Sequence, residues 1–350
     1  MHTLYPDIAP FKFYHLSVGE SDDIGASVSA NVVLEVTQGD QSVQHQLYVE
    51  HCGNPQGIPV LFLHGGPGAG CREKHRCYFN PALYHIILFD QRGCGRSLPT
   101  GDLTNNTADH LMQDIEQIRQ HIGIKQWLIF GGSWGSTLGL YYAQHYPKHV
   151  LGMILRGVFL ARQQDIDWAY GADGAAKLFP EAWHNLVKDL PVEQQQEPLS
   201  AIYQQLSSHN SDISQAMFNK LDDWECSIVT LRARLYPLAS SEISSTTSKT
   251  KTTKIAASII QLYYSLHQCF ISEHALLEHI DPIRHLPTKI IHGRYDMVCP
   301  VEQAWKLKQH WPEAELNIIE MAGHVADEPK MIDALISATN EFSIRFHSSS

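Results

Sequence analysis

The chain has 350 residues, 43% of them hydrophobic, so it can bury a large core and exceeds the length of one average domain. Because 26 Lys and Arg residues stand against 37 Asp and Glu residues, the formal net charge is −11, which argues against nucleic-acid binding and is compatible with cationic small substrates. The 7 cysteines show no C-x-x-C spacing, which disfavours a disulfide framework or a zinc ribbon.

The first residues do not resemble a targeting signal. The segment 1–23 lacks a basic start followed by an apolar stretch, and no segment approaches the roughly 20 apolar residues that cross a bilayer. Together with reduced thiols, this predicts a soluble protein of the cytoplasm that does not bind membranes.

The first third of the chain alternates strand and turn signals. Segments 27–36 and 44–51 alternate apolar and polar residues on either side of a turn at 37–40, which predicts an antiparallel hairpin. Segments 59–63 and 85–89 are almost continuously apolar, which predicts strands buried on both faces of a mostly parallel sheet.

Helices and strands alternate in the next part of the chain. Segment 107–122 has apolar residues at helical spacing and ends at Gly123, which predicts an amphipathic helix. The short apolar runs 126–130 and 150–155 predict two further strands. This order is typical of a parallel sheet covered by helices.

The sequence changes character between residues 161 and 285, where long polar helical stretches rich in Gln, Trp and Tyr appear. The strand pattern resumes at 288–292, so we interpret 161–285 as an inserted helical cap. Residues 1–160 and 286–350 then form the domain that carries the sheet. Within the cap, the Ser/Thr/Lys tract 239–254 has almost no apolar residues and is expected to be a mobile surface loop.

The pattern G-x-S-x-G at 131–135 places Ser133 between glycines. An apolar run precedes it and the helical stretch 136–144 follows it, which is the strand-turn-helix context of a nucleophile elbow. Such a turn strains the serine backbone, and the glycines let strand and helix pack closely. We therefore expect Ser133 to be a nucleophile; the alternative is a structural glycine-rich turn.

Two later residues fit an acid and a base in the order Ser, Asp, His. Asp296 follows the expected strand 288–292, and His324 follows the expected strand 316–320, so both stand in loops just past strand ends. Taken alone, Asp296 could equally cap a turn, and His324 is one of 21 histidines. Their position and order behind Ser133 make them the expected partners of the nucleophile.

Acyl transfer also needs two backbone N–H groups that point at the developing oxyanion. The glycine-rich segment 64–68 follows the expected strand 59–63 and can expose such donors. We expect Gly66 to supply one and Trp134, the residue after the nucleophile, to supply the other. The alternative for segment 64–68 is a tight turn without a catalytic part.

A series of motifs in this order resembles the proline iminopeptidase family, also called prolyl aminopeptidases. They are Gly53-Asn54-Pro55, 64–68 (HGGPG), 89–97 (FDQRGCGRS), 131–137 (GGSWGST), 155–157 (LRG) and 293–300 (GRYDMVCP). The resemblance implies an α/β-hydrolase fold, with a mostly parallel central sheet flanked by helices and an inserted helical cap. It implies removal of an N-terminal proline from peptides with a free N-terminus by Ser133, Asp296 and His324, without a metal or cofactor.

The resemblance also implies an amine-binding pocket in the cap. A free N-terminus is an ammonium near the scissile carbonyl, so the pocket needs anionic or carbonyl acceptors. Glu225 resembles the glutamate of the family's Trp-Glu and is the candidate anchor; the alternative is an exposed helix charge. Phe159 and Tyr170 are candidate contacts of a pyrrolidine ring, with ordinary packing as the alternative, and Arg156 is a candidate to orient a carboxylate or carbonyl.

One position departs from the family pattern. The family commonly carries a second cap glutamate, in a pattern like Ala-Arg-Ile-Glu-x-His-Tyr-Phe, whereas the nearest stretch, 258–264, has Gln261 there. Glutamine can accept a hydrogen bond from an ammonium, but a charge-assisted bond is roughly twice as strong. The prediction of hydrolysis is therefore supported by more residues of the sequence than the prediction of selectivity for proline.

Other functions of the same fold stay open at this point. An esterase, a lactonase or an aminopeptidase of broader specificity could use the same triad. The intact set of Ser133, Asp296 and His324 disfavours a non-catalytic ligand-binding module, and a serine at the elbow disfavours epoxide hydrolases and dehalogenases, which normally carry aspartate there. Cys299, close after Asp296, is expected to make the enzyme sensitive to bulky thiol reagents.

Overall fold

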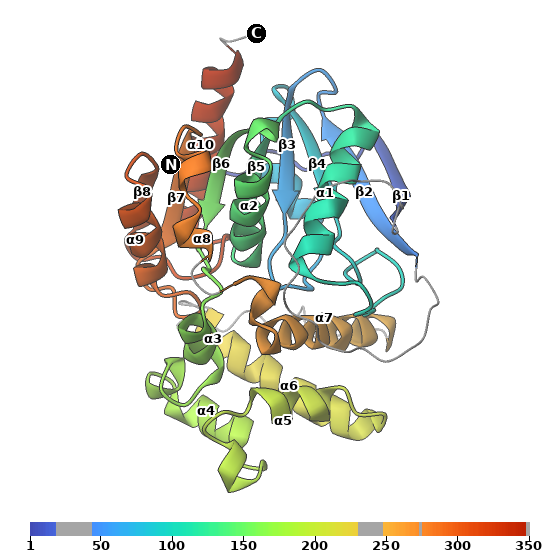
Figure 1. Cartoon of the computed structure of the whole chain (residues 1–350), viewed down its shortest axis with the longest axis vertical. Helices are drawn as coiled ribbons and strands as arrows, with labels where there is room; N and C mark the ends of the chain where they lie inside the picture. Colours follow the sequence, from blue (N-terminus) through green and yellow to red (C-terminus); the bar gives the residue numbers. More distant parts are fainter. Residues whose placement is uncertain (19–43, 230–247, 273–274, 348–350) are drawn as a thin grey trace.

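The computed structural model describes residues 1–18, 44–229, 248–272 and 275–347. Within these ranges, eight strands form one sheet in the order β1-β2-β4-β3-β5-β6-β7-β8 (Figure 1). The strands are β1 (Lys12–Val18), β2 (His45–Gly53), β3 (Ile58–Leu63), β4 (Tyr84–Phe89), β5 (Trp127–Gly132), β6 (Val150–Arg156), β7 (Thr288–Gly293) and β8 (Glu315–Ile319). The pairs β1–β2 and β2–β4 are antiparallel, and the other pairs are parallel. The mostly parallel sheet is thereby confirmed.

Helices cover the sheet and extend beyond one end of it (Figure 1). They are α1 (Ala108–Ile122), α2 (Trp134–His145), α3 (Gln163–Tyr170), α4 (Pro180–Val187), α5 (Leu199–Leu206), α6 (Ser211–Val229), α7 (Ser248–Leu266), α8 (Ala275–Glu278), α9 (Val301–His310) and α10 (Pro329–His347). None of the described helices is long and apolar enough to cross a membrane. No disulfide joins the 7 cysteines, all of which lie in the described ranges.

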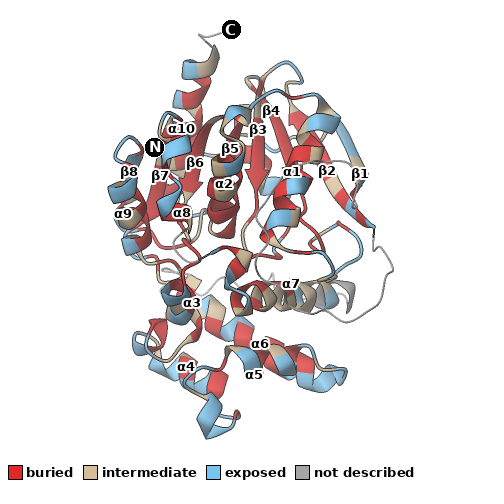
Figure 2. Cartoon of the chain, in the orientation of Figure 1, coloured by how far each residue is buried: buried red, intermediate tan, exposed pale blue. Residues whose placement is uncertain are grey.

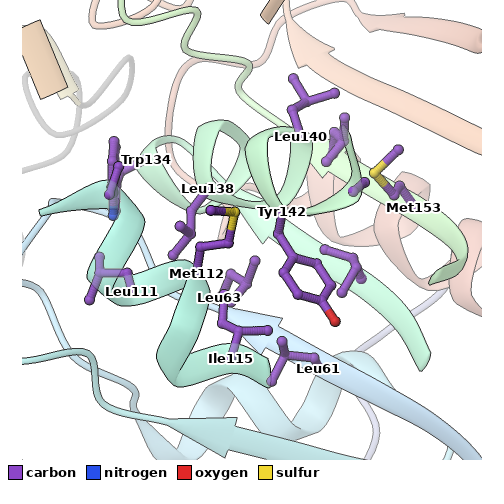
Figure 3. Packing of buried hydrophobic residues seen from close by; sticks show 14 of the residues in the cluster. Leu61, Leu63, Leu111, Met112, Ile115, Trp134, Leu138, Leu140, Tyr142 and Met153 are labelled. Carbon is purple, nitrogen blue, oxygen red and sulfur yellow. The ribbon is translucent and has the colours of Figure 1, made fainter. Parts of the chain in front are cut away.

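Each face of the sheet has its own hydrophobic cluster, because successive side chains of a strand point to opposite faces. In β3, Leu61 and Leu63 lie on the face that α1 and α2 cover, whereas Val60 and Phe62 lie on the face that α10 covers. All residues of β4 are buried, and Figure 2 shows the central strands buried along their length. Figure 3 shows part of the first cluster, including Leu61, Leu63, Leu111, Ile115 and Leu138. The continuous apolar runs of the sequence are thus explained by burial on both faces.

The helix expected at 107–122 is α1, and its ends follow from the local sequence. The Thr107 side chain caps the N-terminus by accepting a hydrogen bond from the His110 N–H. Gly123 ends the helix in the left-handed region, at φ 78°.

The strand expected at 44–51 is β2, but its neighbours differ from the expected hairpin. Strand β2 pairs on one side with β1 and on the other with β4. The expected first arm, 27–36, and the turn at 37–40 lie outside the described residues. The sequence did not indicate β1, because this edge strand leaves most of its side chains at least partly exposed.

The described residues between β6 and β7 are largely helical, and α3, α4, α5 and α6 share a separate hydrophobic cluster. Helix α7 corrects the loop expected at 239–254: residues 248–254 are helical, and 239–247 lie outside the described residues. The segment 248–266 has no Gly or Pro, and Ile255, Ile259 and Leu262 pack on the cluster at helical spacing. The polar first turns therefore extend a helix that its apolar part anchors.

Candidate active site

The G-x-S-x-G segment forms a sharp turn between β5 and α2. Ser133 lies between the two elements at φ 56° and ψ −126°, which is strained for a residue with a side chain. A Cβ atom on Gly131 would lie 2.1 Å from the Gly135 carbonyl oxygen, and one on Gly135 would lie 2.1 Å from the Leu63 carbonyl oxygen. Only glycines fit there, so the local sequence builds the turn that exposes the serine.

Asp296 and His324 meet although they follow different strands, β7 and β8. The His324 Nδ1 lies 2.7 Å from the Asp296 Oδ2. The other carboxylate oxygen accepts hydrogen bonds from the N–H groups of Val298 at 3.0 Å and Cys299 at 2.8 Å. With its Nδ1–H on the carboxylate, the imidazole keeps Nε2 free to act as a base.

The surroundings of Asp296 keep its carboxylate ionised. Burial raises the pKa of Asp296, but the charge and hydrogen bond of His324, together with His292 and the Cys299 N–H, lower it below its usual value overall. His292 donates from Nε2 to the Cys299 carbonyl at 2.8 Å and accepts from the Val158 N–H at 3.1 Å. Burial lowers the pKa of His292, so this second histidine is neutral and holds the loop after β7 by hydrogen bonds. Nothing in the sequence distinguished it from other histidines.

The end of β6 connects the nucleophile to the histidine. The Ser133 N–H donates to the Arg156 carbonyl at 2.9 Å, and the Arg156 guanidinium donates to the His324 carbonyl at 2.7 Å. The next residue, Gly157, has φ 53°, and a Cβ atom on it would lie 3.3 Å from the His324 Cε1 and 3.4 Å from the Asp296 Oδ2. Arg156 therefore holds the elbow and the histidine loop together, and the substrate contact expected for it stays a prediction.

The glycine-rich loop after β3 lies against the elbow. A Cβ atom on Gly65 would lie 3.2 Å from the Gly132 carbonyl oxygen and 3.4 Å from the Ser133 Cβ. Gly66 has φ 111°, which favours glycine. Trp134 is the first residue of α2, and its N–H has no acceptor within the helix. The two expected oxyanion donors therefore flank the serine.

A small cavity of about 60 Å³ opens at Ser133. Its lining comes from the glycine-rich loop, the elbow, the cap and the loop after β7: Gly66, Pro67, Ser133, Phe159, Asp165, Ile166, Ala169, Tyr170, Gln261, Ser265, Cys269, Val298 and Cys299. Phe159, Tyr170 and Gln261 were expected to line it. The Phe159 carbonyl accepts a hydrogen bond from the Thr137 hydroxyl at 2.6 Å, which fixes this residue against α2.

Glu225 lies behind the cap wall of this cavity, in contact with two of its lining residues. The Tyr170 hydroxyl donates to the Glu225 Oε1 at 3.0 Å, and the Gln261 amide donates to the same oxygen at 2.8 Å. Burial raises the pKa of Glu225 to about 7, although the hydrogen bonds from Tyr170 and Gln261 oppose that shift. Glu225 is thus a half-buried, hydrogen-bonded carboxyl behind the cavity wall, which excludes the alternative of an exposed helix charge.

Two further groups line the cavity. Asp165 was not expected there; it pairs with Arg162 at 2.7 Å, and burial raises its pKa against the effect of that partner. Cys299 is 2% exposed, and burial raises the pKa of its thiol well above the usual value. A protonated thiol is a poor nucleophile, which weakens the expected sensitivity to bulky thiol reagents.

Comparison with known proteins places the chain in a family. Residues 58–328 match the family model described as alpha/beta hydrolase fold. A proline iminopeptidase of Xylella fastidiosa (strain Temecula1 / ATCC 700964) is 40% identical over 343 residues, which cover 98% of this chain and 100% of that protein. A proline iminopeptidase of Arabidopsis thaliana is 42% identical over 299 residues, 85% of this chain and 77% of that protein.

Solved structures of other hydrolases share the fold at low sequence identity. A membrane phospholipase A, described as a bacterial virulence factor, superposes with a TM-score of 0.58 at 18% identity, over 85% of this chain and 83% of that one. An alpha/beta fold family hydrolase from Bacillus anthracis str. Sterne gives a TM-score of 0.56 at 16% identity, over 85% and 95%. From its sequence relatives and its fold together, the chain belongs to the proline iminopeptidase family of α/β-hydrolases.

Proposed function

We propose that this chain is a serine aminopeptidase that releases an N-terminal residue, with proline preferred, from peptides with a free N-terminus. One observation carries the proposal: a cavity that opens at the strained Ser133 is closed on its cap side by Tyr170 and Gln261, both hydrogen-bonded to the Glu225 carboxyl. A nucleophile in one small cavity and a carboxyl directly behind its cap wall suit a substrate whose free amine lies one residue from the scissile bond.

The proposed reaction uses the side chains in fixed roles. The Ser133 hydroxyl attacks the carbonyl of the first residue, and the His324 Nε2 takes the hydroxyl proton. Asp296 holds the Nδ1–H and stabilises the imidazolium that forms. The N–H groups of Gly66 and Trp134 stabilise the oxyanion. His324 then gives its proton to the leaving amine, and a water molecule hydrolyses the acyl-enzyme with His324 again as the base.

The proposed amine site sets the distance between the N-terminus of the substrate and the bond that is cleaved. The ammonium of the first residue binds the Glu225 carboxylate, with the Tyr170 hydroxyl and the Gln261 amide as neighbours on the same oxygen. The aromatic faces of Phe159 and Tyr170, which line the cavity, hold the pyrrolidine ring. An internal carbonyl could not reach Ser133, because the cap wall leaves no room for residues N-terminal to the first one.

We also propose how the chain is divided and where it works. Residues 1–160 and 286–350 form the catalytic domain, and 161–285 form the cap, which the separate hydrophobic cluster of α3 to α6 supports. Buried thiols such as Cys94 and Cys299 suit the reducing cytoplasm.

A panel of substrates tests the proposal against the esterase alternative. Prolyl, alanyl and N-acetylprolyl arylamides and a simple aryl ester are compared at one enzyme concentration. The proposal expects the prolyl arylamide to give the highest kcat/KM and the N-acetylated substrate to be nearly inert. Efficient ester hydrolysis without turnover of any free-amine arylamide would favour an esterase or lactonase instead.

A further inference from the structure

One buried glutamine joins the two segments that flank the nucleophile. Gln91 follows β4, is 1% exposed and lies in the loop that begins at Asp90. Its backbone N–H donates to the His64 Nε2 at 3.0 Å, and its side-chain amide donates to the His64 carbonyl at 3.1 Å. Its Oε1 accepts a hydrogen bond from the Trp134 Nε1 at 2.9 Å. Gln91 therefore bridges the start of the glycine-rich loop and the first residue of α2.

The bridge continues through His64 toward the oxyanion loop. Because the His64 Nε2 accepts a hydrogen bond from the Gln91 backbone N–H, its Nδ1 carries the hydrogen that it donates to the Gly65 carbonyl at 2.9 Å. Only the neutral imidazole can make both bonds, and burial lowers the pKa of His64 accordingly. The chain of hydrogen bonds thus ends at the peptide group that joins Gly65 to Gly66.

The neighbouring residue holds the other end of the same loop. Asp90 accepts a hydrogen bond from the Cys71 N–H at 2.7 Å, so the loop from His64 to Cys71 is held at both ends by consecutive residues. Of these two anchors, Gln91 is the one that also reaches the elbow, through the Trp134 indole. That indole packs edge-on against Tyr264 of α7, with ring centroids 5.1 Å apart.

We infer that Gln91 is a positioning residue that sets the spacing between the Gly66 N–H and the Trp134 N–H. The inference rests on the proposed function, because it assigns those two groups to the oxyanion hole. Oxyanion donors contribute most when they are held in place before the reaction, since they then need no reorganisation in the transition state.

A glutamine suits this place because the site asks for both a donor and an acceptor. The His64 carbonyl needs a donor, and the Trp134 N–H needs an acceptor. A glutamate would turn a second acceptor toward the His64 carbonyl, and a methionine of similar length would make neither bond. The planar side-chain amide of Gln91 thereby fixes the distance between the His64 carbonyl and the Trp134 indole N–H.

The test compares two variants that cut the bridge with one that cuts a remote buried hydrogen bond. Gln91→Met removes both side-chain bonds, and Trp134→Phe removes the indole N–H while it keeps the backbone N–H of the elbow. Tyr84→Phe is the control: the Tyr84 hydroxyl donates to the Thr339 carbonyl at 2.5 Å, at the opposite end of β4. Each protein is assayed on a prolyl arylamide and an aryl ester, and inhibited with a prolyl boronate and with proline.

If Gln91 is a positioning residue, its variants should lose binding of the transition state and keep binding of the substrate. Gln91→Met is expected to lower kcat about 10- to 100-fold on both substrates, below the about 10²- to 10³-fold loss of a deleted donor. Inhibition by the boronate, whose tetrahedral adduct occupies the oxyanion hole, is expected to weaken by the same factor. KM and inhibition by proline are expected to stay within about 3-fold of the wild-type values. Trp134→Phe is expected to show the same pattern, and the double variant to lose less than the product of the two single losses.

Several outcomes would overturn the inference. Gln91→Met with unchanged kcat, or with an unchanged boronate constant beside a lowered kcat, would leave Gln91 as core packing. A similar loss in Tyr84→Phe would attribute the effect to stability. If Gln91→Met does not fold, Trp134→Phe carries the same comparison. Turnover of the ester without the arylamide in the wild type would refute the proposed aminopeptidase, while the ester series still tests Gln91.

Discussion

The Gln261 side-chain amide donates a hydrogen bond to the Glu225 Oε1 across 2.8 Å. An uncharged group therefore stands beside the Glu225 carboxyl behind the cap wall of the cavity, at the position where the resemblance implies a second glutamate. An ammonium that binds there meets one negative charge, and its affinity depends on whether Glu225 is ionised.

Glu225→Gln is expected to lower kcat/KM for a prolyl arylamide about 10- to 100-fold, because a hydrogen bond to a charged group is worth about 1.5–3 kcal/mol. The hydrolysis of an aryl ester without an amine is expected to stay near the wild-type rate. Asp223→Asn makes the same chemical change at an exposed position of α6 and is the matched control. Equal losses on both substrates would remove Glu225 from the amine site.

The pH dependence of kcat/KM should differ between substrates. Burial raises the pKa of Glu225 to about 7, so its carboxyl is protonated below that pH and cannot attract an ammonium. For a free-amine substrate, kcat/KM is therefore expected to fall as the pH decreases through about 7. A pH profile of Glu225→Gln should lack this step, and so should the aryl-ester profile of the wild type. Identical acid limbs in all three profiles would contradict the role of Glu225.

Gln261→Glu restores a second carboxylate beside the first. At pH 8 it is expected to raise kcat/KM for the prolyl arylamide about 5- to 10-fold, because a charge-assisted bond is roughly twice as strong as a neutral one. Two like charges on neighbouring atoms also disfavour ionisation, so the acid limb is expected to move to higher pH. Steady-state kinetics from pH 5 to 9 measure both effects, and a variant that matches the wild type in both would show that Gln261 does not contact the amine.

Gly157→Ala should separate catalysis from stability. Both Gly157 and Gly123 have positive φ, at 53° and 78°, so alanine strains the backbone at each and costs about 1 kcal/mol. A Cβ atom at Gly157 would lie 3.3 Å from the His324 ring, whereas one at Gly123 has no neighbour within 4 Å. We expect a similar decrease in Tm for both variants, and a decrease in kcat for Gly157→Ala alone. Comparable kcat in the two would mean that the His324 ring tolerates the contact.

The sequence predicted those parts of the fold whose signal lies within one element. Segment 85–89 is apolar throughout because β4 is buried on both faces, and the glycines around Ser133 are needed by the turn itself. The edge strand β1 has no such signal, because its partly exposed side chains look like loop residues. The first turns of α7 were mistaken for a loop because their polar composition hides a helix that is anchored further along.

The residues that sequence reasoning missed act between elements. His292 bonds to Val158 after β6 as well as to Cys299 after its own strand, and Gln91 joins the loop after β3 to α2. The carbonyl and the guanidinium of Arg156 bond to Ser133 and to His324, a link between two loops that the sequence did not indicate. A single sequence shows which residue types are present but not which loops the strand order brings together.

The most direct test of the aminopeptidase mechanism is the kcat of Ser133→Ala on a prolyl arylamide, measured beside its Tm. The account predicts a loss of about 10⁶-fold, as for a removed serine nucleophile, with a cooperative unfolding transition close to that of the wild type. Turnover at the wild-type rate by the folded variant would contradict the assignment of Ser133 and with it the proposed mechanism.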